Sequence, residues 1–193
     1  MSTQEHLYPR QPVPELSVPI VGGGQWTLAE QEPEHFTLIV VYRGLHCPIC
    51  SGYLAELAKR RDDFAELGVE VVAISTDDEE RATRTAEEWE VDGLNLGYGL
   101  SLEDARAWGL YVSSSRGTTS TGVVEPDRFA EPGLFLVRPD GTLYFGSVQT
   151  MPFARPSFRE IRGAVEWVLE NDYPARGEIV EDLDAAGSPG ASS

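Results

Sequence analysis

Two mainly apolar segments, both rich in β-branched residues, predict buried strands. Residues 36–42 read FTLIVVY and residues 69–75 read VEVVAIS, and both have the length and composition of strands covered on both faces. Between them, apolar positions recur with a period of about 3.6 from Leu54 to Leu67, and Gly68 ends the pattern. This region therefore predicts a strand, a helix and a second strand in succession.

Shorter elements complete the pattern in the second half of the chain. Thr76 and Asp77 each have Glu three residues later, which is the capping-box spacing that opens a helix. Residues 111–131 have no clear period and are rich in Ser, Thr and Gly, so we expect a long functional or mobile loop there. The other predicted elements are a short strand at 94–98, a short helix at 101–108, a hairpin of strands 134–137 and 142–148 around Pro139-Asp140-Gly141, and a last helix at 156–169.

The order of these elements predicts an α/β fold in one domain. Strand–helix–strand units have parallel strands and right-handed crossovers, and the hairpin adds antiparallel strands. We therefore expect a mixed central sheet with helices on both faces. We assign residues 1–14 to an extended N-terminal arm, residues 15–177 to the domain and residues 178–193 to a disordered acidic C-terminal tail.

Charge and hydropathy narrow the range of partners. The formal net charge is −17, so we expect neither nucleic acid nor an anionic membrane as a partner. No apolar run approaches the roughly 20 residues that span a membrane, and the first 15 residues lack the apolar run of a signal sequence. We therefore expect a cytoplasmic protein, and no pattern in the sequence indicates a cofactor.

The candidate chemistry is a pair of cysteines, Cys47 and Cys50, which are the two cysteines of the chain. They follow the first buried strand and open the predicted helix, with Pro48 in its first turn. Free N–H groups and the helix dipole there stabilise a thiolate, which predicts a pKa for Cys47 below the ordinary value of about 8.5. The spacing carries Cys50 inward and allows a disulfide, so we expect Cys47 to be the exposed nucleophile and Cys50 to resolve its adducts.

Other interpretations of this segment stay open. The two cysteines are alternatively buried structural thiols or zinc ligands, although zinc usually takes four ligands and His6, His35 and His46 are not spaced as a partner set. His46 either supports the thiolate when protonated or caps the loop. Arg43 either places a guanidinium near the sulfur or is a solvated loop arginine.

Pro132 is a further candidate site residue. It follows Glu131 and directly precedes the strand predicted at 134–137. It is either a rigid loop end or a cis proline that faces the thiols and offers backbone groups to a disulfide substrate. Its position before the strand favours the cis form.

Residues 36–56, which read FTLIVVYRGLHCPICSGYLAE, are similar to the peroxiredoxin-like branch of the AhpC/TSA (alkyl hydroperoxide reductase/thiol-specific antioxidant) family that carries a thioredoxin-type CxxC. The resemblance includes MPFARPSFREI and NDYPARG near the C-terminus and spans most of residues 15–177. It implies a thioredoxin fold and a thiol-based antioxidant or oxidoreductase activity that draws electrons from a thioredoxin- or glutathione-like donor. It also implies that Cys47 attacks, that Cys50 resolves, and that Pro132 matches the thioredoxin-type cis proline.

Two positions depart from this family. Peroxiredoxins place Thr or Ser three residues before the reactive cysteine, where this chain has Gly44, and their peroxide-polarising arginine falls near Pro132. Arg43 and Arg155 are the candidates to replace that arginine. The sequence thus predicts a thiol–disulfide oxidoreductase that reduces disulfides or peroxides. The alternative is a non-enzymatic redox sensor that binds a partner through the 112–131 loop, and the sequence allows a homodimer.

Overall fold

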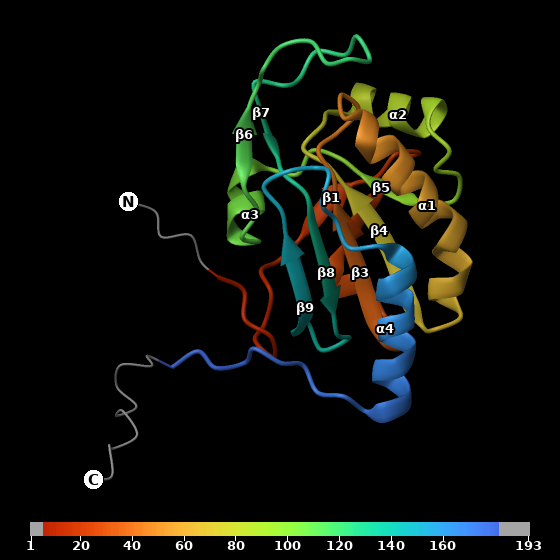
Figure 1. The fold of residues 1–193 in the computed structure, drawn as a ribbon, viewed down its shortest axis with the longest axis vertical. Helices are drawn as coiled ribbons and strands as arrows, with labels where there is room; N and C mark the ends of the chain where they lie inside the picture. The colour runs from red at the N-terminus through yellow and green to blue at the C-terminus, as the bar shows by residue number, and fades with distance from the viewer. Residues whose placement is uncertain (1–5, 182–193) are drawn as a thin grey trace.

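A five-stranded mixed sheet forms the centre of the protein (Figure 1). The structure is a computed structural model that describes residues 6–181. The strands lie in the order β5 (Asn95–Gly97), β4 (Val69–Ile74), β3 (Phe36–Val41), β8 (Gly133–Val137) and β9 (Leu143–Val148). The first three strands are parallel, and β8 and β9 are antiparallel to their neighbours. The predicted mixed sheet is confirmed.

The central strand β3 explains why the sheet is covered on both faces. All six of its residues are buried. Leu38 and Val40 belong to one hydrophobic cluster, whereas Ile39 and Val41 belong to a second cluster on the opposite face. Side chains alternate between the two faces of a strand, so the continuous apolar run supplies both layers at once.

Helices cover both faces of this sheet. Helices α1 (Pro48–Ala65) and α4 (Phe158–Asn171) contact each other and contribute to the first cluster. Helix α3 (Leu102–Ala107) packs into the second cluster together with a small hairpin of β1 (Ser17–Pro19) and β2 (Gln25–Thr27). The remaining helices are α2 (Glu79–Glu88), beside β5, and the short 3-10 helix η1 (Leu28–Glu30).

The segment expected to be a loop without regular structure contains two strands instead. Strands β6 (Val112–Ser114) and β7 (Arg128–Ala130) pair in antiparallel fashion, and the chain between them extends away from the sheet (Figure 1). We call residues 112–130 the outer hairpin. Each strand has only three residues, which is too short to give a visible alternation of apolar and polar positions.

Helix α2 begins later than the capping pattern predicts. Its N-cap is Asp78, whose side chain accepts a hydrogen bond from the Arg81 N–H at 2.9 Å. The predicted caps Thr76 and Asp77 were wrong, because the carboxylate of Asp77 is turned inward and buried. This inward carboxylate belongs to the site described below.

Both ends of the described chain lie along the β9 side of the molecule. Pro12 of the predicted arm forms a bridge with Thr142, and the N–H of Arg10 donates to the carbonyl of Leu143 at 2.8 Å. Arg10 also forms an ion pair with Glu178 at 3.5 Å. Most of the predicted tail, residues 182–193, lies outside the described residues.

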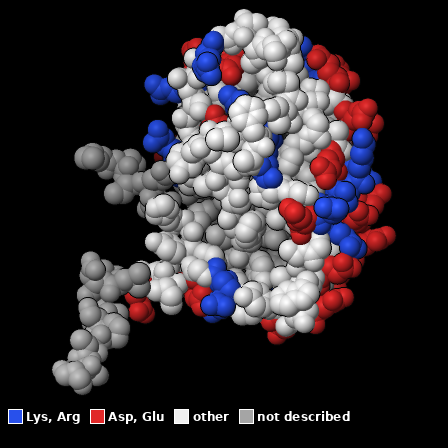
Figure 2. All heavy atoms as spheres, viewed as in Figure 1, with Lys and Arg blue, Asp and Glu red and all other residues white. Residues whose placement is uncertain are grey.

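Charged side chains are unevenly distributed over the face drawn in Figure 2. They gather on the side formed by α1 and α2, whereas the middle of this face is mostly uncharged. Within residues 6–181, no helix has the length and apolar character to cross a membrane.

Candidate redox site

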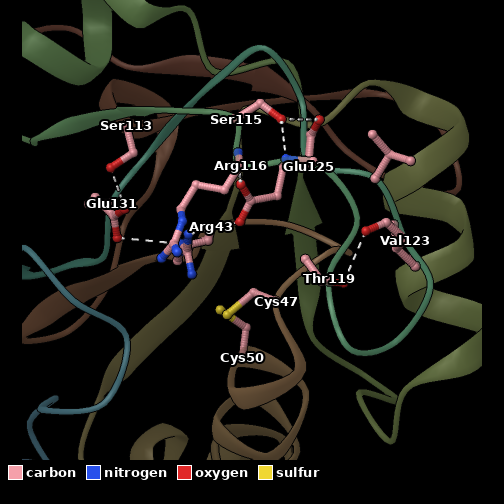
Figure 3. Close-up of polar contacts among 12 residues, drawn as sticks. Arg43, Cys47, Cys50, Ser113, Ser115, Arg116, Thr119, Val123, Glu125 and Glu131 are labelled. Carbon is pink, nitrogen blue, oxygen red and sulfur yellow. Dashed lines mark hydrogen bonds and ion pairs between the residues drawn. The ribbon is translucent and has the colours of Figure 1, made fainter.

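The cysteine pair lies where β3 leads into α1. Cys47 is the N-cap residue of α1, and Pro48 is its first helical residue, as the sequence predicts. The N–H of Cys47 donates to the Gly44 carbonyl at 3.0 Å, and the N–H of Cys50 donates to the Cys47 carbonyl at 3.0 Å. The two cysteines are free thiols, and their sulfur atoms lie next to each other (Figure 3).

Neither sulfur is open to solvent in this structure. Cys47 is 1% exposed and Cys50 is 0% exposed. The expectation of an exposed Cys47 was therefore wrong. Its neighbours Leu45 and His46 are also buried, and the guanidinium of Arg155 lies against the two sulfurs.

Arg155 comes from the segment between β9 and α4. Its Nη2 lies 3.1 Å from the Cys50 Sγ and 3.8 Å from the Cys47 Sγ. Its Nε donates to the carbonyl of Pro152 at 2.8 Å, and its guanidinium stacks on the ring of Tyr53 at 4.7 Å. A cation is thus fixed beside the thiol pair.

The two thiols have opposite pKa shifts. A hydrogen bond from the Cys50 S–H is the largest cause that lowers the pKa of Cys47 well below its ordinary value. Burial opposes this shift, and the charges of Arg155 and Arg43 add to it. Burial, followed by the interaction with Cys47, raises the pKa of Cys50 far above its ordinary value. The arrangement therefore places the negative charge on Cys47 and keeps the proton on Cys50.

The backbone of Arg43 hydrogen-bonds the Cys50 sulfur, whereas its side chain connects the cysteine loop to the outer hairpin. Its side chain forms ion pairs with Glu125 at 3.3 Å and with Glu131 at 3.4 Å (Figure 3). It also stacks on the ring of Phe129 at 4.7 Å. The interpretation of Arg43 as a solvated loop residue was wrong, since its side chain is only 16% exposed. Sequence reasoning missed both glutamates, because isolated acidic residues in a polar segment look like solvated ones.

Gly44 occupies the position at which peroxiredoxins carry a hydroxyl, and no side chain fits there. Its φ is +122°, and a Cβ on it would come within 2.5 Å of the Asp77 Oδ2. That oxygen accepts a hydrogen bond from the Leu45 N–H at 2.7 Å, while Oδ1 pairs with the Arg81 Nε at 3.0 Å. Asp77 thus shapes the cysteine loop. Sequence reasoning could have found this residue, because it follows β4 and therefore lies at the same sheet edge as the cysteine loop.

His46 neither supports the thiolate as a cation nor caps the loop. The ring is fully buried and lies 4.5 Å from the ring of Phe129. Burial, followed by the nearby charge of Arg43, lowers the pKa of His46 to about 4, so the ring is neutral at pH 7. Neither ring nitrogen has a hydrogen-bond partner in the structure.

Pro132 follows a trans peptide bond, because no cis bond occurs in the described chain. The predicted cis proline was therefore wrong. The backbone groups that were expected to hold a disulfide substrate are also occupied. The Glu131 N–H donates to the Tyr111 carbonyl at 2.8 Å, and the Pro132 carbonyl accepts from the Gln149 N–H at 2.9 Å.

No group of three or more metal-ligating side chains lies together in residues 6–181. The chemistry available in the described site is therefore that of two thiols, one adjacent cation and the buried carboxylates around their loop.

A thiol pair of this kind, at the end of a central strand in such a mixed sheet, defines a thioredoxin-fold thiol protein. The chain belongs to the AhpC/TSA family, whose model matches residues 9–145. Membership of this family makes the protein a member of the redox antioxidant class. No curated protein matches the chain.

Solved structures of peroxiredoxins share the fold. The peroxidoxin BcpB from Mycobacterium tuberculosis is 17% identical, with a TM-score of 0.65 over 84% of this chain and 99% of that one. The reduced 2-Cys peroxiredoxin of Plasmodium vivax is 14% identical, with a TM-score of 0.69 over 92% of each chain. AhpC from Enterococcus faecalis is 17% identical, with a TM-score of 0.66 over 87% of this chain and 98% of that one. These likenesses confirm the thioredoxin fold.

Proposed function

We propose that the protein is a thiol-dependent oxidoreductase that cycles Cys47 and Cys50 between the dithiol and the disulfide. The observation that supports this most strongly is the pair of adjacent free thiols at the start of α1 (Figure 3), with the Arg155 Nη2 3.8 Å from the Cys47 sulfur and 3.1 Å from the Cys50 sulfur. In this arrangement the pKa of Cys47 is lowered by the Cys50 hydrogen bond and the pKa of Cys50 is raised by burial. A thiolate is the reactive form of cysteine, so Cys47 is the attacking residue. Cys50, which keeps its proton, lies beside it as the resolving residue.

With a disulfide as the oxidant, the Cys47 thiolate attacks one sulfur and forms a mixed disulfide, while the other sulfur leaves and takes up a proton. Cys50 then loses its proton and attacks the Cys47 sulfur, which releases the second substrate thiol. With a peroxide, Cys50 resolves a sulfenic acid on Cys47 instead. In both cases a thioredoxin- or glutathione-like donor reduces the Cys47–Cys50 disulfide and completes the cycle.

Turnover assays with cysteine variants test this proposal. We expect the wild type to reduce hydrogen peroxide or a model disulfide at the expense of a thiol donor. The Cys47→Ser variant should lose this activity, and Cys50→Ser should react once and then stall. The Cys47→Ser/Cys50→Ser variant is a thiol-free control, because the chain has no other cysteine. Consumption by the wild type at the rate of this control would contradict the proposal.

A redox sensor is the second candidate, and the contacts of Arg43 favour it. Arg43 joins the cysteine loop to Glu125 and Glu131 of the outer hairpin and its flank. Oxidation removes the thiolate charge near Arg43, which changes the electrostatics of this connection. A sensor should alter hydrogen exchange in residues 112–131 on oxidation without measurable turnover. Unchanged exchange in the oxidised protein would exclude it.

A further inference from the structure

Arg155 differs from the other arginines around the thiol pair. Arg43 and Arg81 both have buried carboxylate partners. Arg155 forms no ion pair with a carboxylate within residues 6–181, and its guanidinium contacts the sulfur atoms instead. In an environment of low polarity, a cation without a carboxylate partner stabilises an anion, and here that anion is the Cys47 thiolate.

The donors of Arg155 are only partly used. Its Nε donates to the Pro152 carbonyl and its Nη2 contacts the two sulfurs, whereas its Nη1 is buried and has no hydrogen-bond partner among residues 6–181. An unpaired buried donor costs about 1–3 kcal/mol, so one that persists calls for a functional explanation. Nη1 belongs to the same planar guanidinium as Nη2, which lies 3.8 Å from the Cys47 sulfur, so its N–H groups are available to an acceptor that enters the site.

The guanidinium is held in place before any substrate arrives. It stacks on Tyr53, whose hydroxyl donates to the carbonyl of Pro156 at 2.8 Å, so α1 and the segment that carries Arg155 fix each other. A fixed donor stabilises developing charge without a reorganisation cost. Such a donor is needed here, because Gly44 and Pro132 stand where peroxiredoxins have their hydroxyl and their arginine.

Burial of the thiols limits the size of the oxidant. Because Cys47 is 1% exposed and the Arg155 guanidinium lies beside it, a protein disulfide requires a rearrangement around the site before its sulfur reaches the thiolate. A hydroperoxide offers two adjacent oxygens, which are small and accept hydrogen bonds from a guanidinium. The covered site therefore suits a hydroperoxide better than a protein disulfide.

We propose that Arg155 is a catalytic residue that holds the Cys47 thiolate through Nη2 and binds an oxygen of a small hydroperoxide through Nη1. This inference rests on the proposed function and names the substrate class of the same site. Arg155, in the segment before α4, thus supplies a cation to the thiols. Peroxiredoxins carry the corresponding arginine just before the strand that is equivalent to β8.

The chemical step conserves atoms and electrons. The Cys47 thiolate attacks one peroxide oxygen, an S–O bond forms, the O–O bond breaks, and two electrons pass from sulfur to the peroxide. The second oxygen leaves as an alkoxide or hydroxide, accepts hydrogen bonds from Arg155 and takes a proton from solvent. The Cys50 thiol then attacks the Cys47 sulfenic acid, which forms the disulfide and releases water. A cellular dithiol donor reduces this disulfide.

The test compares Arg155→Met, Arg155→Lys and Arg159→Met in the full-length protein. Arg159 is an exposed arginine on α4 and serves as the matched control. The Cys47 pKa is measured from the ultraviolet absorbance of the thiolate, which needs no access to the sulfur. The rates of Cys47 oxidation by hydrogen peroxide and by a small uncharged disulfide are then divided by the thiolate fraction.

We expect Arg155→Met to raise the Cys47 pKa and to lower the peroxide rate per thiolate by about 100-fold or more, since one fixed donor contributes that much. The disulfide rate per thiolate should change less than tenfold. Arg155→Lys keeps the positive charge but loses the planar set of N–H donors. This variant should retain the low pKa of Cys47 and still react more slowly with peroxide. Arg159→Met should match the wild type.

Three outcomes separate this inference from the proposed function. If the wild type reacts with peroxide and Arg155→Met does so equally fast per thiolate, the inference about Arg155 fails while the proposed function stands. If the wild type reacts with neither oxidant, the proposed function itself fails. Reaction of the wild type with the disulfide alone overturns the assignment of the substrate class.

Discussion

Cys47 and Cys50 have identical side chains and opposite ionisation because their neighbours differ. Cys47 accepts a hydrogen bond from the Cys50 S–H and lies near two arginines, which favour its anion. Both cysteines belong to the cluster that also contains Leu54 and Leu57, but burial is the largest cause of the shift only at Cys50, where it disfavours a second anion. At the scale of single residues, the assignment of nucleophile and resolving thiol follows from this difference.

The absence of a side chain at residue 44 gives a direct prediction. Gly44→Thr would restore the hydroxyl of peroxiredoxins, but its Cβ meets the Asp77 carboxylate and its φ is +122°. We expect a loss of about 2–4 kcal/mol in the free energy of unfolding and no gain in peroxide rate. Gly52→Ala is the control, because Gly52 lies in α1, where an added Cβ would meet no atom within 4 Å, and it should gain about 0.5–1 kcal/mol. If the wild type and Gly44→Thr have equal free energies of unfolding in denaturant titrations, this interpretation of the loop is contradicted.

His46 predicts a pH dependence of stability. Its folded pKa of about 4 lies below the unfolded value of about 6.5, so between these values the unfolded chain binds a proton that the folded chain does not. Stability therefore falls as the pH drops from about 6.5 to about 4. We expect His46→Gln to reduce this loss by about 1–3 kcal/mol, as measured by denaturant unfolding at several pH values.

His35→Gln is the control for this measurement, since the side chain of His35 is 38% exposed. Both variants lose one imidazole, and they differ in how deeply the replaced side chain is buried. If both change the pH profile alike, His46 is not held neutral by its surroundings.

At the scale of elements, buried charges attach the outer hairpin to the cysteine loop. Arg43 lies between Glu125 and Glu131, and the Arg81 Nη2 donates to the Val124 carbonyl at 3.0 Å while its Nε pairs with Asp77. The hairpin is thereby connected to both sides of the loop that carries Cys47. This arrangement explains how a polar segment without a hydrophobic pattern takes a defined position.

A double-mutant cycle on Arg43→Met and Glu131→Gln measures this attachment. The two side chains are 16% and 6% exposed, so we expect a coupling energy of about 1–3 kcal/mol in the free energy of unfolding. Lys59 and Glu90 form an exposed ion pair at 3.3 Å and should give less than about 1 kcal/mol in the same cycle. Equal coupling in both cycles would mean that the buried pair does not hold the hairpin.

Long elements with a strong pattern were predictable, whereas short or polar ones were not. Strands β3 and β4 and helix α1 follow from continuous apolar runs and a helical period, because burial on one or both faces requires such patterns. The outer hairpin was missed because its strands have three residues each. The start of α2 was misplaced because Asp77 satisfies a backbone N–H in another segment rather than its own helix.

At the scale of the whole molecule, the sheet brings together site residues that lie far apart in the sequence. Arg155 is 105 residues from Cys50, and Glu125 is 82 residues from Arg43. No local spacing encodes these contacts, so the sequence offered Arg155 only as a candidate and did not reveal Glu125. The position of Cys47 at the carboxyl end of a central strand was predictable, because open α/β sheets keep their sites there.

The two ends of the described chain lie away from the thiol pair. Arg10 donates from Nε to the Ala175 carbonyl at 2.9 Å and pairs with Glu178, which joins the N-terminal arm to the segment after α4. We expect Arg10→Met to speed proteolytic cleavage within residues 6–14. The oxidation rate of Cys47 should stay within about twofold of the wild type, since the contacts of Arg10 with Leu143, Ala175 and Glu178 involve no residue of the site. A larger change in that rate would show that the termini influence the thiols.

Trapping of the first oxidation product tests the central claim most directly. We expect one equivalent of hydrogen peroxide to convert the reduced wild type to the Cys47–Cys50 disulfide. In Cys50→Ser, the same treatment should leave a sulfenic acid on Cys47 that a sulfenate-specific reagent labels and mass spectrometry locates. Absence of that label, or faster oxidation of Cys50 in Cys47→Ser than of Cys47 in Cys50→Ser, would contradict the assignment of Cys47 as the attacking thiol.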